Sequence, residues 1–276
     1  MSPTSSIEMM AGDLRIKPLP RLPFSIEYPV TFEHDGKILL CGTGDKKCYQ
    51  LDVKGHSWRE HSILNQCRPS GSAISTTTAT FLFGGDFSPH SFEYLPKGSI
   101  TWQIGKSKIP KGFSHGCAIN FQSANEIWLI GGFMTGRRIL KFSIENHTFE
   151  ILPLELNMGR WGHQSLLIPN AQKVLITGGR MDGKDLNSTE ILDLNDKGIE
   201  IASSMNYKRT CHGMGLINVD DKQRIASFGG SNDEQGCLDS VEFYDPFTNK
   251  WETSSQATLR EAKANFGYIT IKWVNL

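Results

Sequence analysis

A chain of 276 residues can bury a large hydrophobic core, and closed all-β folds often use that length as a single domain. Glycine is frequent, with 27 residues, and aromatic residues make up 10%, which suits many short strands joined by tight turns. The 29 basic and 29 acidic residues cancel to a net charge of zero. That balance argues against a dedicated nucleic-acid binder, because such a protein needs a basic surface to neutralise phosphates.

The first 23 residues are expected to hold two short strands, at 7–10 and 13–17. This stretch lacks the basic residues followed by an apolar core that mark a signal peptide. No run of about 18 apolar residues occurs anywhere in the sequence, so no membrane span is predicted.

From residue 38 onward, the chain repeats one pattern, in which an apolar run ends in a pair of glycines. A degenerate first copy ends in Gly42-Thr43, and the copies recur every 42 to 51 residues. A period of this size with strand-like content is typical of the blades of a β-propeller. The four complete pairs are Gly84 and Gly85, Gly131 and Gly132, Gly178 and Gly179, and Gly229 and Gly230.

Each copy of the pattern predicts four strands. A short apolar strand, such as 115–121, precedes the glycine-ended run, and an alternating strand, such as 241–244, follows it. A turn then leads to a fourth strand that often begins with an aromatic residue. The clearest copy is 241–251, where an Asp-Pro turn favours a hairpin. The aromatic residues at this place are Trp58, Trp102, Phe149 and Trp251, and the fourth copy has Ile199 instead.

The glycine pair, together with a later tyrosine and tryptophan such as Tyr244 and Trp251, resembles the kelch repeat over residues 24–272. The resemblance implies an all-β fold, a kelch-type β-propeller. We expect the glycines to adopt backbone angles, or to allow a close approach, that a Cβ would block. We expect Trp58, Trp102 and Trp251 to fill the widening space between blades, each burying roughly 200 Å2.

The two ends of the chain are predicted to close the ring together. Residues 265–271 read as an innermost strand, and 7–10 and 13–17 read as the last two strands of a blade. Joining them gives a sixth, hybrid blade of three strands, with five blades as the alternative. In this scheme, residues 1–23 supply outer strands of the closing blade, and 24–276 form the propeller, all in one domain. Because 23 residues are too few for a BTB or F-box domain, we expect a stand-alone kelch protein, the alternative being a piece of a longer one.

The segment just before each innermost strand carries a cation in five copies of the pattern. Equivalent loops of a closed ring meet around one mouth, so these cations predict a basic ring that captures an acidic peptide of a partner protein. In kelch propellers of ubiquitin-ligase adaptors, arginines of such loops bind substrates, so the resemblance supports this hypothesis. The alternative is that the cations bind neighbouring blades as framework. The five residues are Arg68, Lys111, Arg160, Arg209 and Arg260.

Histidines stand near these cations in three copies, at His115, His163 and His212. A repeated structural hydrogen bond explains them better than a metal site, because copies around a circle would lie too far apart to share one ion. A kelch-type copper oxidase resembles this pattern but binds copper through tyrosines and histidines and carries a Cys–Tyr crosslink; here Tyr207 and Cys211 lie near His212, and nothing else supplies a matching set. We therefore predict no metal, no cofactor and no enzymatic activity, with a copper oxidase or another propeller enzyme as the alternative.

The six cysteines are scattered and form no CxxC pair, so we expect reduced thiols and a cytoplasmic protein. The sequons at Asn146 and Asn187 leave an extracellular binding module as a further alternative. The loops 181–187 and 231–236 are interpreted as hairpin connections that could also add specificity. The predicted function is thus a protein-binding module, with a cullin-ligase component or actin as possible partners, and with neither nucleic acid nor membrane as a partner.

Overall fold

In a computed structural model, the chain is built from β-strands and connecting loops. None of the described residues forms a helix, so none forms one long and apolar enough to cross a membrane. The strands belong to two compact units, a three-blade unit (Ile26–Asp52 and Trp58–Trp161) and a two-blade unit (Met1–Ser25, Val53–Ser57 and Gly162–Leu276). The structure describes residues 8–10, 16–18, 20–22, 26, 28–41, 45–121, 125–196, 198–219 and 222–269.

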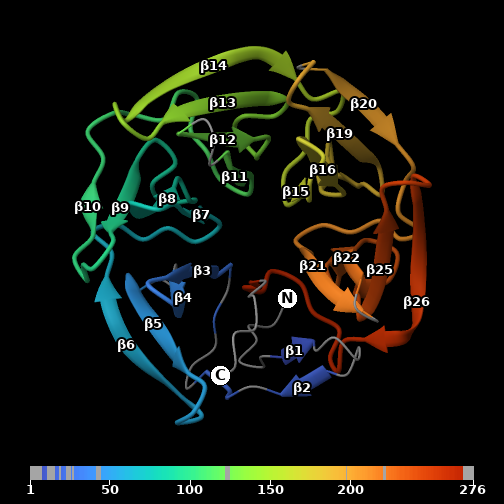
Figure 1. Ribbon diagram of the computed structural model, residues 1–276, viewed down its shortest axis with the longest axis horizontal. Helices are drawn as coiled ribbons and strands as arrows, with labels where there is room; N and C mark the ends of the chain where they lie inside the picture. The colour runs from blue at the N-terminus through green and yellow to red at the C-terminus, as the bar shows by residue number, and fades with distance from the viewer. Residues whose placement is uncertain are drawn as a thin grey trace. The chain divides into compact units, whose positions relative to one another are not determined.

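Three antiparallel sheets of four strands make up the three-blade unit (Figure 1). In each sheet, the strands are hydrogen-bonded in chain order, and the first strands of blades I and III both lie beside the first strand of blade II. Blade I consists of β3 (Val30–His34), β4 (Lys37–Cys41), β5 (Lys47–Asp52) and β6 (Ser57–Ile63). Blade II consists of β7 (Ser72–Ser75), β8 (Ala79–Phe83), β9 (Phe92–Pro96) and β10 (Gln103–Ile104). Blade III consists of β11 (Cys117–Phe121), β12 (Glu126–Ile130), β13 (Arg138–Ser143) and β14 (Thr148–Glu155).

The two-blade unit repeats this plan, with a short extra hairpin between the second and third strands of each blade. These hairpins agree with the interpretation of 181–187 and 231–236 as hairpin connections. Blade IV consists of β15 (Gln164–Ile168), β16 (Lys173–Thr177), β19 (Thr189–Asp193) and β20 (Ile199–Ala202), with the hairpin β17 (Arg180–Met181) and β18 (Lys184–Asp185). Blade V consists of β21 (Gly213–Val219), β22 (Lys222–Phe228), β25 (Ser240–Asp245) and β26 (Lys250–Thr258), with the hairpin β23 (Ser231–Asn232) and β24 (Gly236–Cys237).

The core lies between neighbouring blades, which explains why the glycine-ended strands are apolar along their whole length. All five residues of β8 are buried, as are four of the five residues of both β12 and β16. A strand covered on both faces has no reason to alternate polar and apolar residues. One cluster joins Phe81 and Phe92 of blade II to Leu129 and Phe142 of blade III.

The aromatic residues that begin fourth strands pack against the preceding blade. Trp102 lies in a cluster with Phe32 and Leu39 of blade I, and its Nε1 donates a hydrogen bond to Ser62 Oγ at 3.1 Å. Trp251 of blade V packs in the same way with Ile191 of blade IV. Trp102 and Trp251 are buried, whereas Trp58 of blade I is only half-buried.

The glycine pairs adopt left-handed backbone angles in all four complete copies, where the first glycine has φ between 57° and 63° and the second between 89° and 111°. Close approach adds a second constraint. A Cβ on Gly132 would lie 2.7 Å from the Ser114 carbonyl oxygen, and one on Gly178 would lie 2.4 Å from the Arg209 carbonyl oxygen. Only glycine meets both requirements without strain.

The predicted sixth blade is not formed by the described residues, and the five-blade alternative is what the structure shows. At the N-terminus, β1 (Glu8–Met10) and β2 (Ile16–Pro18) form a two-stranded sheet with each other, close to the predicted 7–10 and 13–17. Residues 265–269 form no strand, and 270–271 of the predicted innermost strand lie outside the described residues. The apolar pattern of 265–269 is therefore not matched by strand pairing.

The expectation that all six cysteines are reduced is wrong for two of them, because Cys41 and Cys48 form a disulfide. The register of blade I brings them together: Leu39 pairs with Gln50 and Leu40 with Tyr49, so the next residues along the two strands face each other. A search for CxxC pairs could not reveal this, since six residues separate the two cysteines. The other four cysteines, Cys67, Cys117, Cys211 and Cys237, are not part of this disulfide.

Candidate partner-binding surface

The loops before the first strands of blades III to V, and the segment before residues 265–269, each have one position that is fixed by the preceding blade. In three consecutive copies, the second glycine of a pair donates its amide to a carbonyl of the following loop: Gly85 to Phe113, Gly132 to Arg160 and Gly179 to Arg209, each at 2.9 Å. Gly230 donates to Lys263 in the same way at 2.8 Å. We call this place the framework position. Phe113, Arg160, Arg209 and Lys263 hold it by this bond, and Arg68 holds it by register, because Arg68 lies two residues before the left-handed Ser70.

The residue two places after the framework position has left-handed backbone angles and connects adjacent loops. His115 donates its amide to the Ser70 carbonyl at 2.9 Å, and Cys211 donates to the Gly162 carbonyl at 2.7 Å. Asn265 donates in turn to the Cys211 carbonyl at 3.1 Å. The five residues at this left-handed position have φ between 51° and 62°: Ser70, His115, Gly162, Cys211 and Asn265.

This register corrects two alignments made from the sequence. Lys111 and Arg260 lie two and three residues before the framework position, whose occupants in those copies are Phe113 and Lys263. His115 lies at the left-handed position, one place earlier than His163 and His212, so the three histidines are not equivalent. His212 is buried, with Nε2 3.0 Å from Thr177 Oγ1, whereas His115 reaches the surface.

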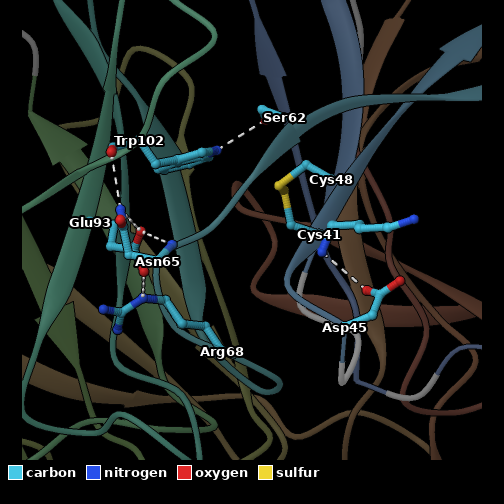
Figure 2. Close-up of a disulfide and its surroundings, with 9 residues drawn as sticks. Cys41, Asp45, Cys48, Ser62, Asn65, Arg68, Glu93 and Trp102 are labelled. Atoms are coloured by element: carbon cyan, nitrogen blue, oxygen red, sulfur yellow. Dashed lines mark hydrogen bonds and ion pairs between the residues drawn. A yellow bond between two sulfur atoms is a disulfide. The ribbon is translucent and has the colours of Figure 1, made fainter.

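Arg68 is fully buried at the framework position, where its guanidinium donates hydrogen bonds to residues of blade II (Figure 2). Its Nε donates to Glu93 Oε1 at 3.0 Å, and its Nη1 donates to the carbonyls of Gly84 and Ser91 at 2.9 Å. Glu93 also accepts the amides of Asn65 and Gln66. Burial lowers the pKa of Arg68, and the Glu93 carboxylate opposes that shift.

Arg209 repeats this arrangement in blade V. Its Nη2 donates to Glu242 Oε1 at 2.6 Å and its Nη1 to the Gly229 carbonyl at 2.8 Å, while Glu242 accepts the amides of Asn206 and Tyr207. The repeated feature is an asparagine three residues before the arginine, as in Asn65 and Asn206, with a glutamate in the third strand. This Asn-x-x-Arg spacing could have revealed the network from the sequence.

Blade III shows that the same place accepts an apolar pair. Its framework residue is Phe113, and Leu140 of β13 occupies the place that Glu93 and Glu242 hold in β9 and β25. Both apolar side chains are buried in one cluster. A large buried side chain is therefore what the framework position requires. It is charged in the blades whose third strand supplies a carboxylate.

The predicted mouth of free guanidinium groups is corrected for three of its five members. Arg68, Arg160 and Arg209 are at most 1% exposed, so their side chains do not face solvent. Arg68 and Arg209 have the framework role that was the alternative to partner binding. Lys111 and Arg260 are exposed, and partner binding by those two stays a prediction.

An aromatic surface lies on the loops of the three-blade unit, next to the left-handed residues. Tyr28, His115, Trp161 and Phe133 follow one another edge to face, with ring centroids 5.4, 5.5 and 5.9 Å apart. Four different loops contribute these rings, so the row exists only in the folded unit. We call it, with Phe87 and Met134, the aromatic loop surface.

Three apolar side chains of this surface are open to solvent: Phe87 is 73% exposed, Phe133 66% and Met134 44%. Each lies in the loop that directly follows a glycine pair. The sequence could have indicated this surface, because the loops that follow the glycine pairs are expected at the surface, where apolar residues such as Phe87 and Phe133 are not buried in a core. Exposed aromatic and methionine side chains are enriched where proteins bind proteins.

Neighbouring residues fix the aromatic loop surface from below. Asp86 accepts a hydrogen bond from Ser70 Oγ at 2.8 Å, and its Oδ1 lies 3.3 Å from His115 Nε2. Burial acts to raise the pKa of Asp86, but hydrogen bonds from His115, Ser70 and Ser114 outweigh it and the pKa is lowered. The negative charge of Asp86 thus holds the His115 ring in place between Tyr28 and Trp161.

The corresponding loops of the two-blade unit are polar and their charges are paired. Arg180 donates to Asp185 at 2.9 Å and to both carboxylate oxygens of Asp233 at 2.9 Å. These contacts hold the β17–β18 and β23–β24 hairpins together and raise the pKa of Arg180, chiefly through Asp233. No group of three or more potential metal-ligating side chains occurs among the residues that the structure describes.

The blades and their loops define a β-propeller, and comparison with known proteins gives its type. No family model matches the sequence. A kelch repeat-containing protein of Dictyostelium discoideum is 25% identical over 196 residues, which is 62% of this chain and 29% of that relative. The chain is thus similar to this kelch repeat-containing protein, and its five four-stranded blades with four complete glycine pairs in register form a β-propeller.

Proposed function

We propose that this propeller is a non-enzymatic module that binds a protein partner through the aromatic loop surface. The observation that carries the proposal is the exposure of Phe133 and Met134 at the end of a fixed row of aromatic rings, together with that of Phe87, which follows Asp86, the residue beside His115. Binding energy in protein interfaces concentrates on such aromatic anchors, and a pre-ordered surface loses little entropy on binding.

Charge supports an acidic segment in the partner. Lys106, Lys108 and Lys111 are exposed in one short loop. Gly112 follows Lys111, and a Cβ on it would lie 2.8 Å from Met134 Sδ, so the loop packs closely against the aromatic loop surface. An acidic peptide, which was predicted to bind a ring of arginines, would instead contact these exposed lysines beside the aromatic loop surface.

The test compares partner capture by the wild-type protein, a Phe133→Ser/Met134→Ser variant and a control. Phe247→Ser is the matched control, because Phe247 is 98% exposed on the β25–β26 turn and its loss removes a comparable exposed ring. We expect the first variant to lose a specific protein that wild type and control retain, with circular dichroism unchanged in all three. Retention of every partner by the first variant would contradict the proposal.

The kind of protein partner depends on whether this protein works in the cytosol or outside the cell. The resemblance supplies cytosolic candidates, a substrate or component of a cullin ligase and actin, and these stay predictions together with the cytoplasmic location. The Cys41–Cys48 disulfide supports instead the alternative of an extracellular binding module, because disulfides persist in oxidising compartments. Co-purification of cullin subunits or co-sedimentation with actin filaments would decide for the cytosolic candidates.

A further inference from the structure

The first observation is the position of the disulfide in blade I (Figure 2). Cys41 and Cys48 are both fully buried and pack with Phe32, Leu39 and Trp102 in the core between blades I and II. A bridge formed in such a core is shielded from soluble thiols. It points to folding in a compartment where thiols are oxidised.

The second observation is the sequon of blade III, which the fold presents to solvent. Asn146 lies in the turn between β13 and β14, and its side chain is exposed. The hydroxyl-bearing residue of the sequon, Thr148, is exposed at the start of β14.

His147, between them, points the other way. Its ring packs against Tyr94 at 4.8 Å and against Phe92 and Phe142 at 5.6 Å. Its amide donates to the Ser143 carbonyl at 2.9 Å. This anchor fixes the turn while the Asn146 side chain stays exposed to solvent, where a large attached group can be accommodated.

The second sequon lacks this freedom. Asn187 Nδ2 donates to the Met205 carbonyl at 3.0 Å, and the hydroxyl-bearing Thr189 is fully buried. A group attached to the Asn187 nitrogen would break that hydrogen bond and crowd the loop between β18 and β19. The folded protein therefore accepts a glycan at only one of the two sequons.

We propose that Asn146 is an N-glycosylation site, in a protein whose blade I is closed by the Cys41–Cys48 disulfide in the same oxidising compartment. The glycan donor is a lipid pyrophosphate-linked oligosaccharide. The Asn146 side-chain nitrogen forms a bond to the anomeric carbon and loses one proton, while the bond from that carbon to the lipid pyrophosphate breaks and the lipid pyrophosphate leaves. For the disulfide, each thiol gives up one proton and one electron to a disulfide-bearing oxidoreductase, which is reduced to its dithiol.

The test uses the full chain produced in the cells that naturally make it, as wild type, Asn146→Gln and Asn187→Gln. We expect peptide N-glycosidase to lower the mass of wild type and Asn187→Gln and to leave Asn146→Gln unchanged. Denatured but unreduced wild type is expected to resist alkylation at Cys41 and Cys48. Wild type unaffected by the glycosidase, a glycan on Asn187, or alkylation of both cysteines would each overturn the proposal.

Discussion

Replacing Glu93 by leucine would leave the Arg68 guanidinium buried without its counter-charge. Arg68 is fully buried, and the Glu93 carboxylate accepts its Nε at 3.0 Å together with the amides of Asn65 at 2.7 Å and Gln66 at 2.9 Å. Removing one partner of a buried ion pair costs about 3–5 kcal/mol, and each backbone amide left unpaired adds about 1–3 kcal/mol where it is buried. We expect Glu93→Leu to lower the free energy of unfolding by at least about 4 kcal/mol.

Urea denaturation followed by tryptophan fluorescence measures this change, because Trp102 lies beside the network and its carbonyl accepts Asn65 Nδ2 at 3.0 Å. With a urea m-value of about 3 kcal/mol/M, the midpoint falls by more than about 1 M. The matched variant is Arg68→Phe/Glu93→Leu, which copies Phe113 and Leu140 of blade III. It removes both charges at once and is expected to be more stable than Glu93→Leu alone.

Two results would refute this reasoning. A Glu93→Leu midpoint close to wild type would mean that Arg68 does not depend on its carboxylate. The losses of unfolding free energy in Glu93→Leu and in Arg68→Phe can be added and compared with the loss in the double variant. Equal values would mean that the two charges do not interact. Either result would contradict the role of the Arg68–Glu93 pair in stabilising blade II.

Three further predictions concern stability. Gly132→Ala should cost more than 1 kcal/mol and Gly136→Ala much less, as measured by urea midpoints, because both have positive φ but only Gly132 would bring its Cβ against a carbonyl oxygen. Burial lowers the pKa of His147, so the folded state favours the neutral ring. The stability that this ring contributes is fully present above its unfolded pKa of about 6.5 and is lost as the pH falls below that value. His147→Phe should therefore reduce the fall in melting temperature at low pH. Replacing Cys41 and Cys48 by alanine should cost about 2–3 kcal/mol by urea denaturation, since the bridge closes a loop with a sequence separation of 7; an unchanged midpoint would contradict a formed bridge.

The periodic features of the fold could be predicted from sequence because they are set by local geometry. A glycine pair is required wherever the chain turns at positive φ against a neighbouring carbonyl, so Gly131 and Gly132 mark the end of a blade's second strand, as the other pairs do. An aromatic residue that begins the fourth strand, such as Trp102 or Trp251, fills a space that every blade leaves.

The loops could not be predicted in the same way, because their lengths differ between copies. Aligning the loops by their leading cation placed Lys111 with Arg160, whereas the hydrogen bond from Gly85 shows that Phe113 holds that position. Charge alone also gave the wrong surroundings for Arg68, because its partner Glu93 is 25 residues away and becomes a neighbour only when the third strand pairs. The disulfide was missed for the same reason, since strand register brings its cysteines together.

Site-specific photocrosslinking tests whether a protein partner contacts the aromatic loop surface. A photoreactive amino acid is placed at the position of Phe133 or, as control, at that of Phe247, both of which are exposed aromatic sites. The account predicts a covalent partner adduct from the Phe133 position and none from the Phe247 position. A partner that binds both labelled proteins yet crosslinks only from the Phe247 position would contradict it.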